Sequence, residues 1–228
     1  ASDQLAMSNM RPLADTENFI LVYPQGSILE DDGFTHWNTY LPGGDNKSDA
    51  DDFGFIDVML DVLFSSYAID ASRVYAAGFS NGGDFSYTLA CFLSDKIAGI
   101  ASVSGLMWVG TLEECDLTHP TALISFHGTA DGARPYDGWD GYMVSIDDTL
   151  SYWNAHNNIV DEAEMTGIND SGYNIQRYQY EGGDGGTAVT HYKVLGGGHL
   201  WFSFYDDGVE TDQLIWDFLS QFDRDGLR

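Results

Sequence analysis

The chain has 228 residues, of which 43% are hydrophobic, and its net charge is −27 because 36 acidic residues face only 9 lysines and arginines. This apolar content excludes a disordered chain and is enough for one sizeable core. The acidic surface repels nucleic acid and anionic membranes, so we expect neither as a partner. No run of 18 apolar residues is present that could span a membrane. We expect residues 1–228 to form a single acidic domain.

The first half of the chain alternates between apolar runs and helical patterns. Residues 19–24 form a continuous apolar run that ends in Pro-Gln-Gly, which predicts a strand buried on both faces. Apolar side chains recur at helical spacing over 53–67. A short strand pattern at 73–77 then leads into a glycine-flanked serine and a second helical pattern over 84–93.

The second half continues this alternation, and its glycine-rich stretch at 182–186 predicts a hairpin turn between the last two strands. Strands that alternate with helices indicate the α/β class, with a mostly parallel sheet flanked by helices on both faces. The strand patterns lie at 97–103, 122–126, 174–180 and 189–195, and the helical patterns at 144–156 and 212–222.

The glycine-flanked serine fits the pattern G-x-S-x-G, with Ser80 between Gly78 and Gly82. The pattern needs small residues two before and two after the serine, because a Cβ there would collide with backbone in so tight a turn. A strand precedes the turn and a helix follows it, so we expect Ser80 to be a nucleophile. The helix N-terminus also places the backbone N–H of Asn81 where it can stabilise an oxyanion.

A serine hydroxyl needs a neighbouring imidazole that accepts its proton, and with this turn the acid and then the histidine follow the serine along the chain. His199 comes directly after the glycines at 196–198 and the last strand. Asp131 lies on the loop after the strand at 122–126. Both are expected at one edge of the sheet, with His199 as general base and Asp131 as the acid that orients it.

Three other histidines have simpler structural interpretations. His156 lies in a helical pattern, His191 lies in the middle of a strand, and His127 ends a strand. We expect none of them to act as the base.

Aspartates cluster at Asp45, Asp49, Asp51 and Asp52, where a calcium loop could be imagined. The run does not fit an EF-hand, because Phe53 occupies a position that must supply a ligand. We expect no metal site.

The two cysteines, Cys91 and Cys115, allow one intramolecular pairing. A single pair is typical of an exported protein, although two free buried thiols would have the same sequence. No basic segment followed by an apolar one begins the chain. If the protein is exported, we expect its leader to have been removed.

Several short motifs, spread over nearly the whole chain, together resemble the polyhydroxybutyrate depolymerase and feruloyl esterase group of carbohydrate esterase family one, in the α/β-hydrolase superfamily. They are Leu13-Ala14-Asp15, residues 19–26, Trp37-Asn38, residues 52–56, residues 69–75, residues 78–83, Leu89-Ala90-Cys91, Val103-Ser104-Gly105, residues 127–131 and residues 197–201.

The resemblance implies an α/β-hydrolase fold with Ser80, Asp131 and His199 as catalytic triad and a disulfide between Cys91 and Cys115. It implies a secreted or periplasmic serine esterase that needs no cofactor and forms an acyl-enzyme. Its substrates would be small or polymeric esters, namely polyhydroxyalkanoate, feruloyl, acetyl or other short-chain esters. Two alternatives stay open: a serine peptidase on the same fold, and a non-catalytic binding module descended from an esterase.

One departure from the family concerns the N-terminal region. Family members carry a strand and a His-Gly-rich loop ahead of the stretch that matches residues 13–15, and this loop supplies the second oxyanion donor. The sequence contains no such segment. We therefore expect a domain that lacks the N-terminal strands, either because the chain is N-terminally incomplete or because one donor has been lost.

Two tryptophans are candidates for substrate binding. Trp37 and Trp201 fall in loops beside the expected site, and Trp201 lies two residues past His199. Flat apolar faces bind aromatic or polyester chains, so we expect Trp201 to line the acyl or alcohol pocket. Core packing is the alternative for such residues.

Overall fold

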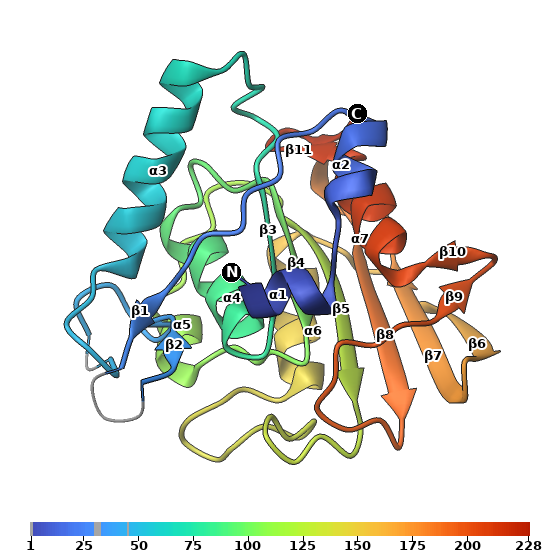
Figure 1. Ribbon diagram of the computed structural model, residues 1–228. Coiled ribbons are helices and arrows are strands. Elements are labelled where there is room, and N and C mark those ends of the chain that lie inside the picture. The colour runs from blue at the N-terminus through green and yellow to red at the C-terminus, as the bar shows by residue number, and fades with distance from the viewer. Residues whose placement is uncertain (1, 30–32, 45) are drawn as a thin grey trace.

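The computed structural model describes residues 2–29, 33–44 and 46–228 and is built around a six-stranded sheet in the order β3-β4-β5-β8-β7-β6 (Figure 1). Strands β3, β4, β5 and β8 run parallel, whereas β7 and β6 are antiparallel to their neighbours. The mostly parallel sheet expected from the sequence is confirmed. Its strands are β3 (Tyr75–Phe79), β4 (Gly99–Val103), β5 (Ala122–Gly128), β6 (Glu164–Asp170), β7 (Tyr173–Tyr180) and β8 (Val189–Leu195).

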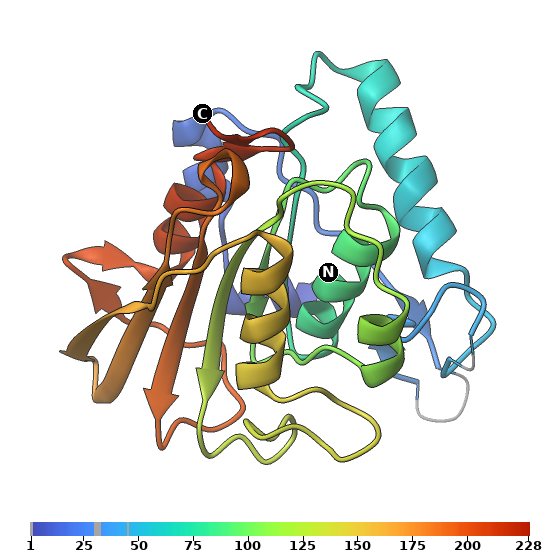
Figure 2. The same cartoon turned by 180° about the vertical axis from the view of Figure 1, so that it is seen from behind.

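Helices cover both faces of this sheet, as Figures 1 and 2 show from opposite sides. Helices α3 (Asp52–Ser66), α4 (Asn81–Phe92) and α6 (Ile146–His156) contribute to the core on one face. Helix α7 (Thr211–Leu219) contributes to the core on the other. In the part of the chain that the structure describes, no helix combines the length and hydropathy that crossing a lipid bilayer requires.

Shorter elements complete the fold. They are α1 (Ser2–Met7), α2 (Arg11–Glu17), α5 (Val109–Glu113), the 3-10 helix η1 (Asp184–Gly186), and the two-stranded ribbons β1 (Ser27–Ile28) with β2 (Thr35–His36), β9 (Tyr205–Asp206) with β10 (Val209–Glu210), and β11 (Phe222–Asp223) with β12 (Gly226–Leu227).

The strand predicted at 19–24 is wrong. The segment has no regular secondary structure, and the side chains of Ile20 and Val22 are 50% and 39% exposed. A cavity separates the segment from the edge of β3, so the two backbones do not pair. The ring of Phe19 instead stacks on Trp216 of α7, with centroids 3.9 Å apart. An apolar run shows that side chains need burial, but not that a strand is near enough to pair with it.

Strand β6 was not predicted, because its residues are largely polar. In the structure all of its residues are exposed or half-buried. Such a pattern is typical of an edge strand, where few side chains reach the core. The hairpin predicted at 182–186 is confirmed, since η1 lies between the antiparallel strands β7 and β8.

The disulfide between Cys91 and Cys115 is confirmed, and it joins residues 24 apart in the sequence. It ties the end of α4 to the segment after α5. Cys91 is 2% exposed and belongs to the core, whereas Cys115 is half-buried and packs against it.

Replacing both cysteines by alanine should lower the free energy of unfolding by about 3 kcal/mol, because the closed loop no longer restricts the unfolded chain. Urea denaturation of the variant and of the parent protein measures the difference, and the parent protein under reducing conditions is the control. A change below about 1 kcal/mol in both would contradict the assigned role.

Candidate active site

Four parallel strands direct their carboxyl ends to one edge of the sheet, and the loops after them are joined there by backbone hydrogen bonds. The residue that follows β3 or β4 donates its N–H to a carbonyl near the end of the neighbouring strand. Ser80 donates to Val103 at 2.9 Å and Ser104 donates to Phe126 at 2.8 Å. Thr129 donates in the same way to Val194 at 2.9 Å. The loops that carry Ser80, Asp131 and His199 are therefore held side by side.

The turn at Ser80 has a strained backbone, with φ 53° and ψ −119°, a conformation that few residues other than glycine adopt. A Cβ on Gly78 would lie 2.2 Å from the carbonyl of Gly82, which makes glycine obligatory there. Helix α4 begins directly after Ser80, so the side chain stands at the helix N-terminus. Strand, turn and helix follow one another as predicted.

The prediction that position 82 needs a small residue is wrong. A Cβ at that position would meet no atom within 4 Å. The collision that the motif avoids would be between a side chain at position 78 and the backbone of residue 82. Glycine is therefore needed at position 78 but not at position 82. Gly83 is the tighter position, because a Cβ there would lie 2.8 Å from Ser102 Oγ.

The structure brings together three residues that lie far apart in the sequence, Ser80, Asp131 and His199. His199 Nε2 lies 2.8 Å from Ser80 Oγ, and His199 Nδ1 lies 2.8 Å from Asp131 Oδ2. In the tautomer with the proton on Nδ1, the imidazole donates to Asp131 and accepts from the Ser80 hydroxyl. The Asp131 side chain is fully buried, whereas that of His199 is 24% exposed. This is the geometry that base-assisted attack by a serine requires.

The loops of Asp131 and His199 are fastened to one another. Ala130 donates its N–H to the carbonyl of Gly197 at 2.8 Å, and Thr129 Oγ1 accepts the N–H of Gly196 at 2.8 Å. A Cβ on Gly128 would lie 2.2 Å from the Gly197 carbonyl, so the two loops touch through their backbones. Sequence reasoning found the glycines before His199 but not Thr129, whose role depends on a partner 67 residues away.

Asn81 makes two hydrogen bonds through its side chain. Its side-chain Oδ1 accepts the N–H of Trp37 at 2.7 Å, and its Nδ2 donates to the Trp37 carbonyl at 3.1 Å. These two bonds hold the loop of Trp37 beside the turn at Ser80. The indole of Trp37 stacks on Phe85 of α4, with centroids 5.1 Å apart and planes 13° apart.

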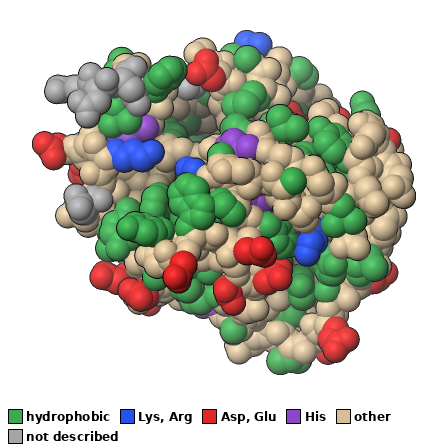
Figure 3. Space-filling model, turned by 90° about the horizontal axis from the view of Figure 1, so that it is seen from below, with side chains coloured by type: hydrophobic (Ala, Val, Ile, Leu, Met, Phe, Trp, Pro, Cys, Tyr) green, Lys and Arg blue, Asp and Glu red, His purple; other side chains and the backbone are tan. Residues whose placement is uncertain are grey.

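A cavity of about 580 Å³ is lined by Gly78 and Gly82 of the turn and by Trp37 and Trp201, whereas Ser80, Asp131 and His199 do not line it. From there it extends along the edge of β3 to residues 19–24. Trp201 donates its Nε1–H to Asp212 at 3.2 Å, which fixes the orientation of its ring. Figure 3 looks onto the face toward which the arrows of β5 and β8 point in Figure 1, and there hydrophobic patches lie among histidine atoms that reach the surface.

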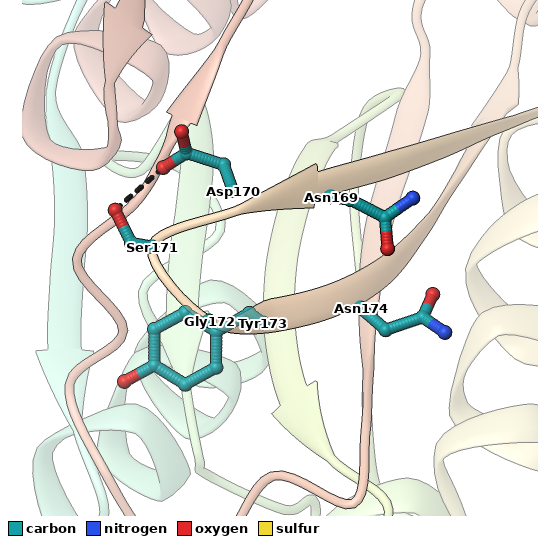
Figure 4. Close-up of a pocket in the computed structure, with 6 residues that line it drawn as sticks. All are labelled: Asn169, Asp170, Ser171, Gly172, Tyr173 and Asn174. Carbon is teal, nitrogen blue, oxygen red and sulfur yellow. Dashed lines mark hydrogen bonds between the residues drawn. The ribbon is translucent and has the colours of Figure 1, made fainter.

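A second hollow, of about 420 Å³, lies at the turn between β6 and β7 and is lined by residues 169–174 (Figure 4). Asp170 accepts from the hydroxyl of Ser171 at 2.6 Å and from the N–H of Tyr205 at 2.9 Å. Its carboxylate therefore stabilises the turn. Strand β6 ends the sheet opposite to β3, so this hollow is separate from the candidate site.

Two proteins of fungi are similar in sequence to most of this chain. The bifunctional acetylxylan esterase/xylanase of Neocallimastix patriciarum is 28% identical over 223 residues, which are 98% of this chain and 29% of that protein. Feruloyl esterase B of Piromyces equi is 31% identical over 194 residues, 82% of this chain and 33% of that protein. The chain thus spans about a third of the length of these relatives.

Among solved structures, the acetyl xylan esterase from Aspergillus awamori superposes with a TM-score of 0.57 at 15% identity, over 86% of this chain and 77% of that one. The Bacillus cereus carboxylesterase has a TM-score of 0.50 at 15% identity, over 85% of this chain and 75% of that one. These likenesses show the fold. No family model matches the chain.

The chain thus resembles feruloyl and acetylxylan esterases in sequence and has an α/β-hydrolase-like fold. The relatives named above are acetylxylan and feruloyl esterases, so they lend no support to polyhydroxyalkanoate as a substrate.

The chain contains a second serine–histidine pair. Ser125 Oγ of β5 lies 2.8 Å from His191 Nδ1 of β8, and Tyr136 Oη lies 2.9 Å from His191 Nε2. Ser125 and His191 are 2% and 0% exposed. Burial lowers the pKa of His191 to about 3, so the ring stays neutral. The pair is closed off from solvent and joins two strands.

His127 and His156 also have structural partners. His127 Nε2 donates to the carbonyl of Arg134 at 2.7 Å, and burial lowers the pKa of its imidazole. His156 Nε2 donates to the carbonyl of His119 at 2.8 Å.

The acidic cluster has structural partners as well. Asp51 accepts the N–H of Gly54 at 2.8 Å and caps helix α3. Asp52 is buried and accepts the N–H of Asn38 at 2.7 Å, and burial raises the pKa of its carboxyl group. Asp45 lies outside the described residues. Within the described ranges, no three metal-ligating side chains are grouped as an ion would need.

Stability should fall as the pH drops below about 6.5, because the unfolded chain then protonates His191 whereas the folded chain, with a pKa of about 3 there, does not. The contribution of this residue reaches at most about 1.4 kcal/mol per pH unit. Urea denaturation of the parent protein and of His191→Gln between pH 7 and pH 4 should give the variant a shallower pH dependence. Equal slopes would contradict the assignment.

Proposed function

We propose that the protein is a carboxylic ester hydrolase in which Ser80 is the nucleophile, His199 the general base and Asp131 the residue that orients the imidazole. The observation that carries the proposal is the chain of two 2.8 Å hydrogen bonds from Ser80 through His199 to Asp131. Its position at the carboxyl ends of parallel strands, in an esterase-like α/β hydrolase, supports the same role.

The proposed reaction has two steps of acyl transfer. Ser80 Oγ attacks the ester carbonyl while His199 Nε2 takes its proton, and the buried carboxylate of Asp131 stabilises the imidazolium. The backbone N–H of Asn81 stabilises the oxyanion of the tetrahedral intermediate. His199 then protonates the leaving alcohol. Water attacks the acyl-enzyme by the same route and restores Ser80.

We propose feruloyl or acetyl esters as substrates, since the relatives' names specify feruloyl and acetylxylan esterases. Trp37 and Trp201, which line one cavity with Gly82, support an aromatic acyl group. The disulfide between Cys91 and Cys115 supports an extracellular or periplasmic location. We also propose that residues 1–228 act as a single domain.

Ser80→Ala should reduce the hydrolysis of p-nitrophenyl acetate at least about 10⁴-fold, because no other hydroxyl takes over the attack. The variant should also resist labelling by a fluorophosphonate, which the parent protein accepts. Ser125→Ala is the matched control, since it removes the other histidine-bonded serine and should leave the rate within about threefold.

Three outcomes would contradict the proposal. Absence of labelling in both the parent protein and Ser80→Ala would indicate a non-catalytic binding module, and equal labelling of the two would indicate a nucleophile other than Ser80. Cleavage of peptide anilides without turnover of any ester would indicate a peptidase.

Trp201→Ala should raise the Michaelis constant for a feruloyl ester roughly tenfold, because about 1.4 kcal/mol of contact with the aromatic acyl group is lost. The constant for an acetyl ester should change little, since a methyl group does not reach the indole face. Steady-state kinetics on both esters measure the two effects, with Trp139→Ala as an exposed-tryptophan control. A Michaelis constant that is unchanged for every ester would contradict a role for Trp201 in binding the acyl group.

A further inference from the structure

An ion pair beneath the candidate site joins helix α4 to the loop of Asp131. Asp84 lies four residues after Ser80 and is completely buried. Its carboxylate accepts from Arg134 Nη2 at 2.7 Å and from Arg134 Nε at 3.1 and 3.2 Å. It also accepts the N–H of Leu106 at 2.8 Å, from the segment after β4. Asp84 therefore contacts the loops that follow two neighbouring strands.

The backbone of Arg134 is bonded to the residues around the proposed acid. The N–H groups of Arg134 and Ala133 both donate to Asp131 Oδ1 at 2.8 Å, which leaves Oδ2 for His199. The carbonyl of Arg134 accepts from His127 at 2.7 Å. One residue thus holds the nucleophile helix with its guanidinium group and the acid with its amide.

Stability alone explains this pair poorly. Burial raises the pKa of Asp84, and the charge of Arg134 opposes that rise. The desolvation of two charges largely cancels their attraction, so apolar residues of similar volume often stabilise a core as well or better. A bidentate guanidinium–carboxylate pair does, however, fix both distance and orientation between the two elements that carry it.

We propose that Arg134 is a positioning residue whose ion pair with Asp84 fixes the Asp131 loop against helix α4, and so sets the distances from Asp131 to His199 and from His199 to Ser80. The inference rests on the proposed function of Ser80. Arg134 acts through Asp131 and does not line the cavity beside Gly82. Its loss should therefore lower kcat and leave KM nearly unchanged.

The test compares three variants with the parent protein. Arg134→Met removes the guanidinium but keeps the amide, and a displacement of about 1 Å in the Asp131 loop should lower kcat up to about 100-fold. Arg134→Lys keeps the charge and one hydrogen bond but not the bidentate geometry, so it should recover about tenfold of that loss and stay below the kcat of the parent protein. Arg177→Met is the matched control, because Arg177 pairs with the buried Asp206 between β7 and β9. It should lower the melting temperature without lowering kcat.

A second measurement needs no turnover. The proton on His199 Nδ1 should give a downfield NMR signal because it is hydrogen-bonded to a carboxylate, and the loss of this signal in His199→Gln would assign it. The signal should shift or vanish in Arg134→Met and return toward its parent position in Arg134→Lys. In Arg177→Met it should not move.

The outcomes separate this inference from the proposed function. An unmoved His199 signal in Arg134→Met would overturn the positioning role, and so would a kcat within about twofold of the parent or no lower than that of Arg177→Met. If Arg134→Met does not fold, the kcat and the His199 signal of Arg134→Lys decide instead. Values of both that equal those of the parent protein would overturn the role. An inactive parent protein would refute the proposed function, and the NMR comparison would still decide the role of Arg134.

Discussion

The backbone at Ser80 is held in a left-handed conformation between β3 and α4, and this turn depends on the missing side chain of Gly78, whose Cβ would lie 2.2 Å from the Gly82 carbonyl. The turn points the Ser80 hydroxyl out of the sheet edge and starts a helix immediately behind it. The same helix carries Asn81, which holds the loop of Trp37, and Asp84, which reaches the loop of Asp131. The arrangement of the site follows from the direction that this turn gives to α4.

The loops around the turn are fixed by hydrogen bonds between segments far apart in the sequence. Parallel strands place the loop ends in register, and the backbone N–H groups of Thr129 and Ala130 bond the acid loop to β8 and to the loop of His199, respectively. Ser104 Oγ donates to the carbonyl of Leu200 at 2.9 Å and anchors the histidine loop to the end of β4. Such a network keeps side chains on flexible loops in one geometry, which proton transfer through an imidazole requires.

The errors of sequence reasoning have identifiable physical causes. The apolar run at 19–24 indicated burial, but Phe19 stacks on α7 and the Tyr23 hydroxyl bonds to Ser8 between α1 and α2, while the backbone stays unpaired with β3. Gly82 fitted the motif, yet the turn needs no small residue there. Strand β6 has little apolar alternation, since it lies at the sheet edge. In each case the sequence pattern reflects the chemistry of the side chains, whereas the local structure depends on which segment packs beside them.

The sequence by itself determined the α/β alternation, the turn at Ser80, and the order of Ser80, Asp131 and His199, because these depend on local periodicity and on loops that follow strands. Only the tertiary structure decided that Ser125 and His191 form a closed pair and that Arg134 bonds to Asp84, 50 residues away. Side-chain partners across strands depend on sheet order and register, which local patterns do not encode. Distances within the site therefore had to come from the folded chain.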